Sequence, residues 1–305
     1  MKNTFLISLL LVGIHLQCTE AQTIQERLGY DKNTKLLIVH ADDLGVSHSE
    51  NMASFEAIEK GMVTSASILV PAPWFSEVAA YAQANPDVDF GIHLCLNSEW
   101  KHYKWGTVSD PSQVASLLEK NGFLPDNGQW VAENADIREM ELEMRAQIDR
   151  TIASGITPTH IDAHMMTAYR RADFVEVLLK ISQEYKLPIG VDVKELKARY
   201  PELDFPEMVS LDKLYGAGPE DYEKSLAEYY TTVLRGLAPG LNEILVHTAY
   251  DDAEMQAITV DHTNWGSDWR QQDFDFFTSD ACKAILKEES IQLITWKAVQ
   301  DQLMK

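Results

Sequence analysis

Cysteine and positive charge are both scarce in this chain, and each scarcity argues against a class of protein. The 305 residues include only three cysteines, Cys18, Cys95 and Cys282, and no Cys-x-x-Cys pair. A thiolate zinc site or an iron–sulfur cluster is therefore not expected. Lysine and arginine number 26 against 47 aspartates and glutamates, which gives a net charge of −21. A phosphate backbone needs clustered positive charge, so nucleic acid is not an expected partner.

Long hydrophobic runs are also scarce, and the one at the N-terminus has the layout of a secretory signal peptide. Lys2 precedes an apolar run from Phe5 to Val12, which is too short to span a bilayer comfortably. Small residues, Thr19 and Ala21, then stand at the −3 and −1 positions of a cut before residue 22. We expect residues 1–21 to be removed and residues 22–305 to form one exported domain, periplasmic or extracellular.

Two alternatives for this segment stay open. It could be a hydrophobic first helix of the domain, or Cys18 could carry a lipid anchor. The residues before Cys18, His15-Leu16-Gln17, lack the small residue usually found next to a lipidated cysteine. No other stretch is apolar and long enough to cross a membrane.

Cys95 and Cys282 could pair in an oxidising compartment, but each lies within an apolar element, so we expect two buried free thiols.

Hydrophobic periodicity predicts alternating strands and helices, which favours parallel strands joined by crossover helices. A less regular insertion with one short helix is expected over residues 97–134. A single barrel-like α/β domain is the simplest architecture that fits this order. The alternative is a doubly wound open sheet, but no Gly-rich loop that could bind a nucleotide phosphate follows the first strand. The predicted strands are 35–40, 64–70, 88–96, 159–163, 188–193, 243–247 and 291–295, and the predicted helices are 49–60, 75–84, 137–152, 174–185, 219–235 and 279–289.

Carboxylates and histidines stand at the carboxyl ends of four of these strands. They are the pair Asp42-Asp43 and the single residues His93, His164 and His247. In a parallel α/β barrel such ends meet on one rim. One carboxylate and two imidazoles can hold a divalent ion with positions left open, while the other carboxylate is free to act as a base. The alternatives are a helix cap for the aspartates and core packing for each histidine. His40, His48, His102 and His262 receive no functional role.

Four segments, in order, resemble the YdjC-like carbohydrate deacetylases, a family that includes chitooligosaccharide deacetylase. They are Leu-Ile-Val-His-Ala-Asp-Asp-Leu-Gly at 37–45, Val-Thr-Ser-Ala-Ser at 63–67, Gly-Ile-His-Leu at 91–94 and Pro-Thr-His-Ile-Asp-Ala-His at 158–164. The similarity runs from about residue 35 to residue 296. It implies a distorted, TIM-like (β/α) barrel and removal of acetyl groups from N-acetylated sugars or oligosaccharides. It also implies one divalent metal ion held by Asp43, His93 and His164, with Asp42 as the catalytic base.

The chain departs from the family pattern at two places. Met165 and Met166 follow His164 where the resemblance leads us to expect further histidines, and Thr248 follows His247 where proline is expected. The metal ligands are unaffected, but the natural substrate is left open. His247 is the available donor of a proton to the departing amine. The ion is Mg²⁺ or Zn²⁺, since histidine favours zinc and an open oxygen-rich site also admits magnesium.

Five of the seven tryptophans lie in segments without a clear helical or strand pattern. Exposed on loops above the rim, they could stack on sugar rings; otherwise they cover the end of the barrel. These five tryptophans are Trp100, Trp105, Trp130, Trp265 and Trp269.

Other functions remain open. The protein could be a glycosidase, although the side chains of the neighbouring Asp42 and Asp43 should point apart, or a metal phosphoesterase, or a secreted carbohydrate-binding protein without activity. The sequence also leaves open whether the chain is a monomer or a homodimer.

Overall fold

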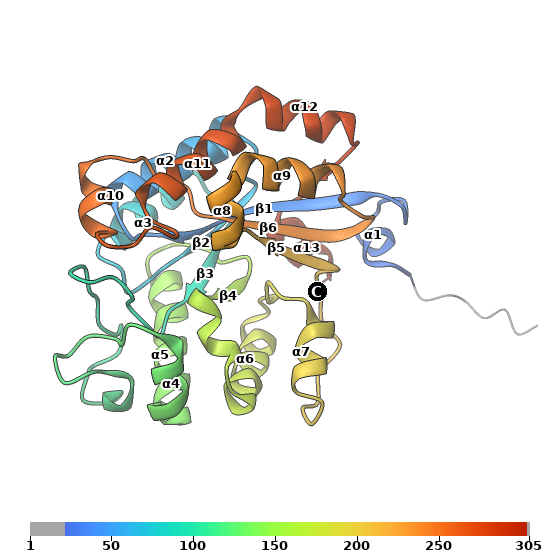
Figure 1. Ribbon diagram of the computed structural model, residues 1–305. Coiled ribbons are helices and arrows are strands. Elements are labelled where there is room, and N and C mark those ends of the chain that lie inside the picture. Colours follow the sequence, from blue (N-terminus) through green and yellow to red (C-terminus); the bar gives the residue numbers. More distant parts are fainter. Residues whose placement is uncertain (1–21, 304–305) are drawn as a thin grey trace, which may run out of the picture.

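One parallel β-sheet forms the centre of the protein, as a computed structural model describing residues 22–303 shows (Figure 1). Its order is β4-β3-β2-β1-β6-β5, and β7 pairs with the first residues of β1. Every described pair is parallel, which confirms the predicted α/β class with crossover helices. The strands are β1 (Lys35–Leu44), β2 (Ser65–Ile68), β3 (Phe90–Leu94), β4 (Ile161–Ala163), β5 (Lys213–Gly216), β6 (Gly240–Val246) and β7 (Gln292–Leu293).

Helices surround this sheet. In Figure 1, α9, α11 and α12 lie above β1 and β6, whereas α4 to α7 lie on the opposite side, below β3 and β4. Two 3₁₀ helices, Ala115–Leu117 and His164–Tyr169, add to them. The α-helices are α1 (Ile24–Arg27), α2 (His48–Lys60), α3 (Phe75–Ala84), α4 (Gly128–Asn134), α5 (Ile137–Ala153), α6 (Ala172–Tyr185), α7 (Val193–Arg199), α8 (Pro219–Lys224), α9 (Leu226–Arg235), α10 (Ala253–Ile258), α11 (Ser267–Thr278), α12 (Asp280–Glu288) and α13 (Trp296–Leu303).

The sheet curves into a distorted barrel whose last gap is bridged by an irregular segment rather than a strand. The prediction of a strand over 188–193 is wrong: Ile189 forms a single parallel bridge with Ile161 of β4. On its other side, Val191 accepts a hydrogen bond from the Leu211 N–H at 3.1 Å. The segment stays short because α7 begins at once, at residue 193, with Asp192 as its N-cap.

Side chains inside the barrel change from apolar to charged along β1. Leu36 and Ile38 belong to a buried apolar cluster with Trp296. Successive residues of a strand point to opposite faces, so His40 and Asp42 continue the same inward-facing row. Both are buried, with 0% and 6% exposure. The carboxyl end of the barrel is therefore built from charged groups that rest on an apolar base.

Three further sequence predictions can be compared with the fold. The helix expected over 219–235 is two helices, α8 and α9, because the chain turns at Ser225, whose hydroxyl caps α9. Strand β5 and helices α1, α7, α10, α11 and α13 were not predicted. The insertion 97–134 contains one α-helix, α4, as expected. Cys95 and Cys282 are buried and free, as predicted.

The predicted signal peptide, residues 1–21, lies outside the described residues. Among the residues that are described, none of the helices combines the length and the apolar character that crossing a bilayer requires.

Candidate metal centre and active site

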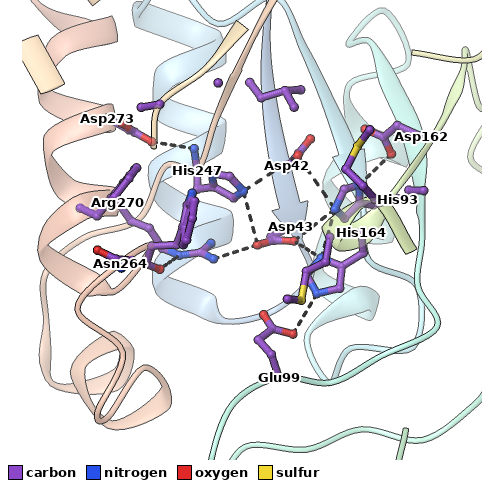
Figure 2. A pocket seen from close by; sticks show the side chains of 18 of the residues that line it. Asp42, Asp43, His93, Glu99, Asp162, His164, His247, Asn264, Arg270 and Asp273 are labelled. Atoms are coloured by element: carbon purple, nitrogen blue, oxygen red, sulfur yellow. Dashed lines mark hydrogen bonds and ion pairs between the residues drawn. The ribbon is translucent and has the colours of Figure 1, made fainter. Parts of the chain in front are cut away.

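A cavity of about 860 Å³ opens at the carboxyl ends of the strands (Figure 2). The five residues predicted from the sequence all line it, so the strand ends meet as expected. They are Asp42, Asp43, His93, His164 and His247.

A β-bulge brings both adjacent aspartates to this one cavity. The pairing of β1 with β2 shifts between Ala41 and Leu44, and Asp43 adopts a left-handed backbone conformation with φ of +70°. Aspartate tolerates this conformation better than bulky or β-branched residues do. In a regular strand the two carboxylates would point apart, which is what the sequence predicted. The structure corrects that expectation: the bulge turns Asp43 so that both carboxylates lie near His93.

Three donor atoms converge at one point of the cavity. Asp43 Oδ1 lies 3.4 Å from His93 Nε2 and 3.1 Å from His164 Nδ1, and the two ring nitrogens are 3.2 Å apart. All three residues are buried. Ligands about 2.1 Å from a common ion are separated by about 3.0–3.4 Å when neighbouring bonds are 90–110° apart. The three distances fit one metal ion.

The remaining nitrogen of each of these histidines is held by a carboxylate. His93 Nδ1 is 2.7 Å from Asp162 Oδ1, and His164 Nε2 is 2.9 Å from Glu99 Oε2. These contacts favour tautomers whose lone pairs face Asp43 Oδ1, which is buried without a hydrogen-bond donor. Converging lone pairs repel unless a cation lies between them. The residues therefore fit a bound metal ion, with Asp162 and Glu99 orienting the two histidine ligands.

Protons compete with a metal ion for this site. Burial lowers the pKa of His164, but the charges of Glu99 and Asp43 outweigh it and raise the pKa well above 6.5. Burial likewise lowers the pKa of His93, and Asp162 and Asp42 raise it above its ordinary value. Metal binding must displace these protons, so affinity should fall as the pH falls.

Arg270 is a residue of the candidate site that sequence reasoning missed. Its Nη2 donates to Asp43 Oδ2 at 2.8 Å, and its Nη1 donates to Glu50 Oε1 at 2.5 Å, with all three side chains buried. Burial raises the pKa of Asp43, but His164 and Arg270 overcome this and hold it well below its usual range. Arg270 thus keeps Asp43 ionised and directs its other oxygen toward the histidines. It belongs to α11, a helix that was not predicted.

The two oxygens of Asp42 face different surroundings. Oδ1 is 3.2 Å from His40 Nε2 and accepts a hydrogen bond from Ser67 Oγ at 3.3 Å. Oδ2 is 4.0 Å from His93 Nε2 and 3.9 Å from His247 Nε2. One oxygen is therefore anchored in the protein while the other faces the converging donors.

His247 lies across the cavity from His93. Its Nε2 is 4.0 Å from Asp43 Oδ2, and its backbone N–H donates to Asp273 Oδ2 at 2.9 Å. Burial and the charge of Arg270 lower the pKa of His247 to about 4, so the ring is neutral at pH 7. It must first acquire a proton in order to act as an acid.

Two other groups of histidines and aspartates also have possible ligand atoms close together, and Asp162 belongs to both. It lies with His40 and His160 in one group and with Asp42 and His93 in the other. Asp162 Oδ1 already pairs with His93 Nδ1 and Oδ2 with His40 Nε2, at 2.7 and 3.1 Å. His40 and His160 do not line the cavity. The Asp43 group fits an ion better, since all three of its residues line the cavity and it does not depend on Asp162, both of whose oxygens are already paired.

Most of the predicted loop tryptophans are buried, which favours the alternative that they cover the barrel end. Trp100, Trp105 and Trp269 are at most 3% exposed, and Trp130 is half-buried. Only Trp265, among the five, presents a large surface, at 40% exposure on the cavity wall. Its φ is +55°. Trp265 stacks on Trp269 with ring centroids 5.0 Å apart, and its carbonyl accepts from Arg270 Nε at 2.8 Å.

Met165 and Met166 occupy the cavity rim where further histidines were expected. Both have left-handed backbone conformations, with φ of +50° and +56°, and both are more than 40% exposed. The departure from the family pattern therefore concerns the cavity mouth and leaves the three donors in place.

Comparisons with known proteins agree with this architecture. The chain is 32% identical to a carbohydrate deacetylase of Thermus thermophilus over 292 residues, covering 91% of this chain and 98% of the relative. It is 28% identical to a chitooligosaccharide deacetylase of Serratia marcescens, covering 85% of this chain and 97% of the relative. A crystal structure from Enterococcus faecalis, of a protein with a proposed role in cellobiose-phosphate cleavage, shares the fold. Its TM-score is 0.71 at 24% identity, and the match covers 87% of this chain and 99% of that one.

A sequence model described as YdjC-like protein matches residues 36–288, most of the chain. This match includes the bulged aspartates, both histidine donors and Arg270. The chain therefore belongs to the YdjC-like family.

Proposed function

We propose that this protein is a metal-dependent carbohydrate deacetylase that hydrolyses the N-acetyl group of an amino sugar. The observation that carries the proposal is the three-donor group Asp43, His93 and His164, which opens on one cavity beside a separate carboxylate, Asp42. Relatives that share most of their length with this chain are named carbohydrate deacetylases. An amide needs both activation of its carbonyl and a base to deprotonate water, and this arrangement offers both.

The chain's own residues divide the reaction between them. A divalent ion held by Asp43, His93 and His164 would polarise the acetyl carbonyl and make water more acidic. Asp42 Oδ2 accepts the proton of the attacking water, and Oδ1 keeps the carboxylate fixed through His40 and Ser67. Arg270 pairs with Asp43 and keeps that carboxylate ionised. The products are acetate and a free amine, which takes up one proton as it leaves.

Two imidazole nitrogens with one carboxylate oxygen form a donor set that favours Zn²⁺ or a similar transition ion over Mg²⁺, which binds mainly through carboxylates and water. We therefore propose a zinc-like ion as the resident metal. Metal-free protein reloaded with Zn²⁺ or with Mg²⁺ distinguishes them through acetate release, and activity restored by Mg²⁺ alone would reverse the assignment.

His247 is proposed to protonate the departing amine. The neutral ring obtains the proton of the attacking water through Asp42, whose Oδ2 lies 3.9 Å from His247 Nε2 and must approach to about 3 Å for the transfer. His247→Ala should reduce hydrolysis of an N-acetyl amide about 10²-fold or more. Activated acetate esters, whose leaving groups need no proton, should be affected far less. Equal losses on both substrates, measured as kcat/KM, would mean that His247 only binds substrate or supports the fold.

Trp265 is proposed to stack against a sugar ring of the substrate. Its strained backbone is fixed by Arg270 and by stacking on Trp269, as expected for a residue positioned for binding. Trp265→Ala should raise KM for an N-acetylglucosamine oligomer several-fold with kcat little changed, since stacking of this kind contributes about 0.5–1.5 kcal/mol. Trp265→Phe should retain most of the affinity. Trp74→Ala, a change at a 37% exposed tryptophan away from the cavity, is the control; an equal KM for all variants would exclude stacking.

The proposed function is tested by the products formed from N-acetylglucosamine oligomers. A deacetylase releases acetate and leaves the chain length unchanged. A glycosidase produces new reducing ends, a metal phosphoesterase acts only on phosphate esters, and a binding protein leaves the oligomer intact. Absence of acetate from metal-loaded protein, with any of these other outcomes, would overturn the proposal.

Export is proposed as well, supported by the signal-peptide pattern of residues 1–21. Protein secreted by a bacterial host should begin at Gln22, and intact-mass measurement identifies the first residue directly. A mass that includes Met1 would refute cleavage, and a chain that begins at a lipid-modified Cys18 would favour the lipoprotein alternative.

A further inference from the structure

A buried histidine beneath the cavity links the proposed base to the support of a metal ligand. His40 is completely buried and does not line the cavity. Its Nε2 is 3.1 Å from Asp162 Oδ2 and 3.2 Å from Asp42 Oδ1. Asp162 Oδ1 in turn contacts His93 Nδ1 at 2.7 Å. A single imidazole N–H is therefore shared between two carboxylates that serve different parts of the site.

The contact with Asp42 fixes the orientation of that carboxylate. The terminal torsion of an aspartate is broad, so an unrestrained carboxylate rotates freely. His40 and Ser67 both hold Oδ1, and this leaves Oδ2 as the oxygen directed toward the converging donors. A proton acceptor must lie within hydrogen-bond reach of the proton it removes. The direction of Oδ2 is thus a requirement for the base, and the two groups beneath it meet that requirement.

We propose that His40 is a positioning residue that holds Asp42 in the orientation needed to accept a proton from water. The inference rests on the proposed deacetylase function and deepens it. His40 touches neither the cavity nor any of the three donor atoms, so it acts through Asp42 on catalysis. Its second contact, with Asp162, allows a different route: His40 could instead influence catalysis by supporting His93 and the metal ion that His93 would hold. The test has to separate these two routes.

Two substitutions at position 40 isolate the hydrogen bond. A glutamine carboxamide reaches about as far as the imidazole Nε2 and keeps one donor there, whereas leucine has none. We expect His40→Leu to lower kcat about 10²-fold, the loss typical of a misplaced catalytic group, and His40→Gln to recover most of it. KM should change less than about twofold, because His40 lies outside the cavity. Ser67→Ala, which removes the other bond to Asp42 Oδ1 without touching Asp162, should also lower kcat while leaving KM unchanged.

A double-mutant cycle decides the route. In an Asp42→Asn background the same His40 substitutions should cause little further loss of acetate release, because residues that act as a unit are not additive. Metal affinity, measured by titration of metal-free protein, should be equal in wild type, His40→Gln and Ser67→Ala. Additive losses, or metal affinity that falls in parallel with kcat, would overturn the proposal in favour of the Asp162 route.

Failure of the proposed function is recognised separately, since wild-type protein would then release no acetate at all. In that case crystal structures of the His40→Gln, His40→Leu and Ser67→Ala proteins test the positioning role of His40 by itself. Asp42 Oδ2 should keep its direction in His40→Gln and lose it in His40→Leu, or in Ser67→Ala if leucine prevents folding. An Asp42 carboxylate that is unmoved in every variant would overturn the positioning role.

Discussion

Replacing His93 with alanine is expected to remove the bound divalent ion and abolish acetate release. His93 Nε2 is one of the three donors that converge in the described structure, and the other two cannot complete a site by themselves. Loss of a residue that merely supports a ligand already weakens metal binding about 10–100-fold, so loss of a ligand should cost more. Elemental analysis of purified protein should show about one ion per wild-type chain and almost none in His93→Ala.

The alanine variant also leaves Asp162 Oδ1 without its partner, which could destabilise the fold. His93→Asn avoids this, because the asparagine carboxamide places a donor near the position of Nδ1 but has nothing at the position of Nε2. It should retain the thermal stability of the wild type and still lose the metal. His48→Ala, a change at an exposed histidine on α2, should keep both metal and activity. Equal metal content in wild type and both His93 variants would exclude His93 as a ligand.

The sequence predicted most of the regular elements because their signals are local. The bounds predicted for α3, residues 75–84, agree with the structure, and α2 differs by one residue. Apolar periodicity and a following glycine or proline are enough for such elements. The segment 188–191 is different: its apolar residues fill the gap in the barrel with one bridge and isolated hydrogen bonds. Nothing in its local pattern separates this arrangement from a strand.

The candidate site was predicted in outline but not in its geometry. The strand-end pattern indicated Asp43, His93 and His164, and the structure brings them together as predicted. The bulge that turns Asp43 depends on how β1 pairs with β2, which no residue pattern revealed. Its ion pair with Arg270 joins residues 227 positions apart, and hydrogen bonds of this range leave no local signal.

The roles of Asp162 and His40 also could not be predicted from the sequence. Both lie within segments that carry the family resemblance, yet the sequence assigned neither of them a role. Their importance follows from shared contacts, since the His40 ring touches carboxylates from β1 and β4 at once. Only the curvature of the sheet places those two strands around one imidazole.

Asp42→Asn is expected to lower kcat for deacetylation by about 10²–10⁴-fold, the contribution typical of a general base. The metal ion should stay, because Asp42 is not among the three converging donors. The fold should stay too: the asparagine carbonyl oxygen can still accept hydrogen bonds from His40 and Ser67, while the Oδ2 position loses its ability to take up a proton. The expected protein is therefore folded, metal-loaded and nearly inactive.

This combination separates a base from a ligand or a structural residue. A ligand variant such as His93→Asn loses metal and activity together, whereas Asp42→Asn should lose activity alone, with KM for the oligomer little changed. Asp126→Asn, a change at an exposed aspartate on the cavity wall, controls for the loss of one negative charge and should stay within about twofold of wild type. Acetate release by Asp42→Asn within a few-fold of wild type would assign Asp42 a structural role. The proton of the attacking water would then need another acceptor, and His247, whose Nε2 lies 3.9 Å from Asp42 Oδ2, is the neighbouring imidazole to test.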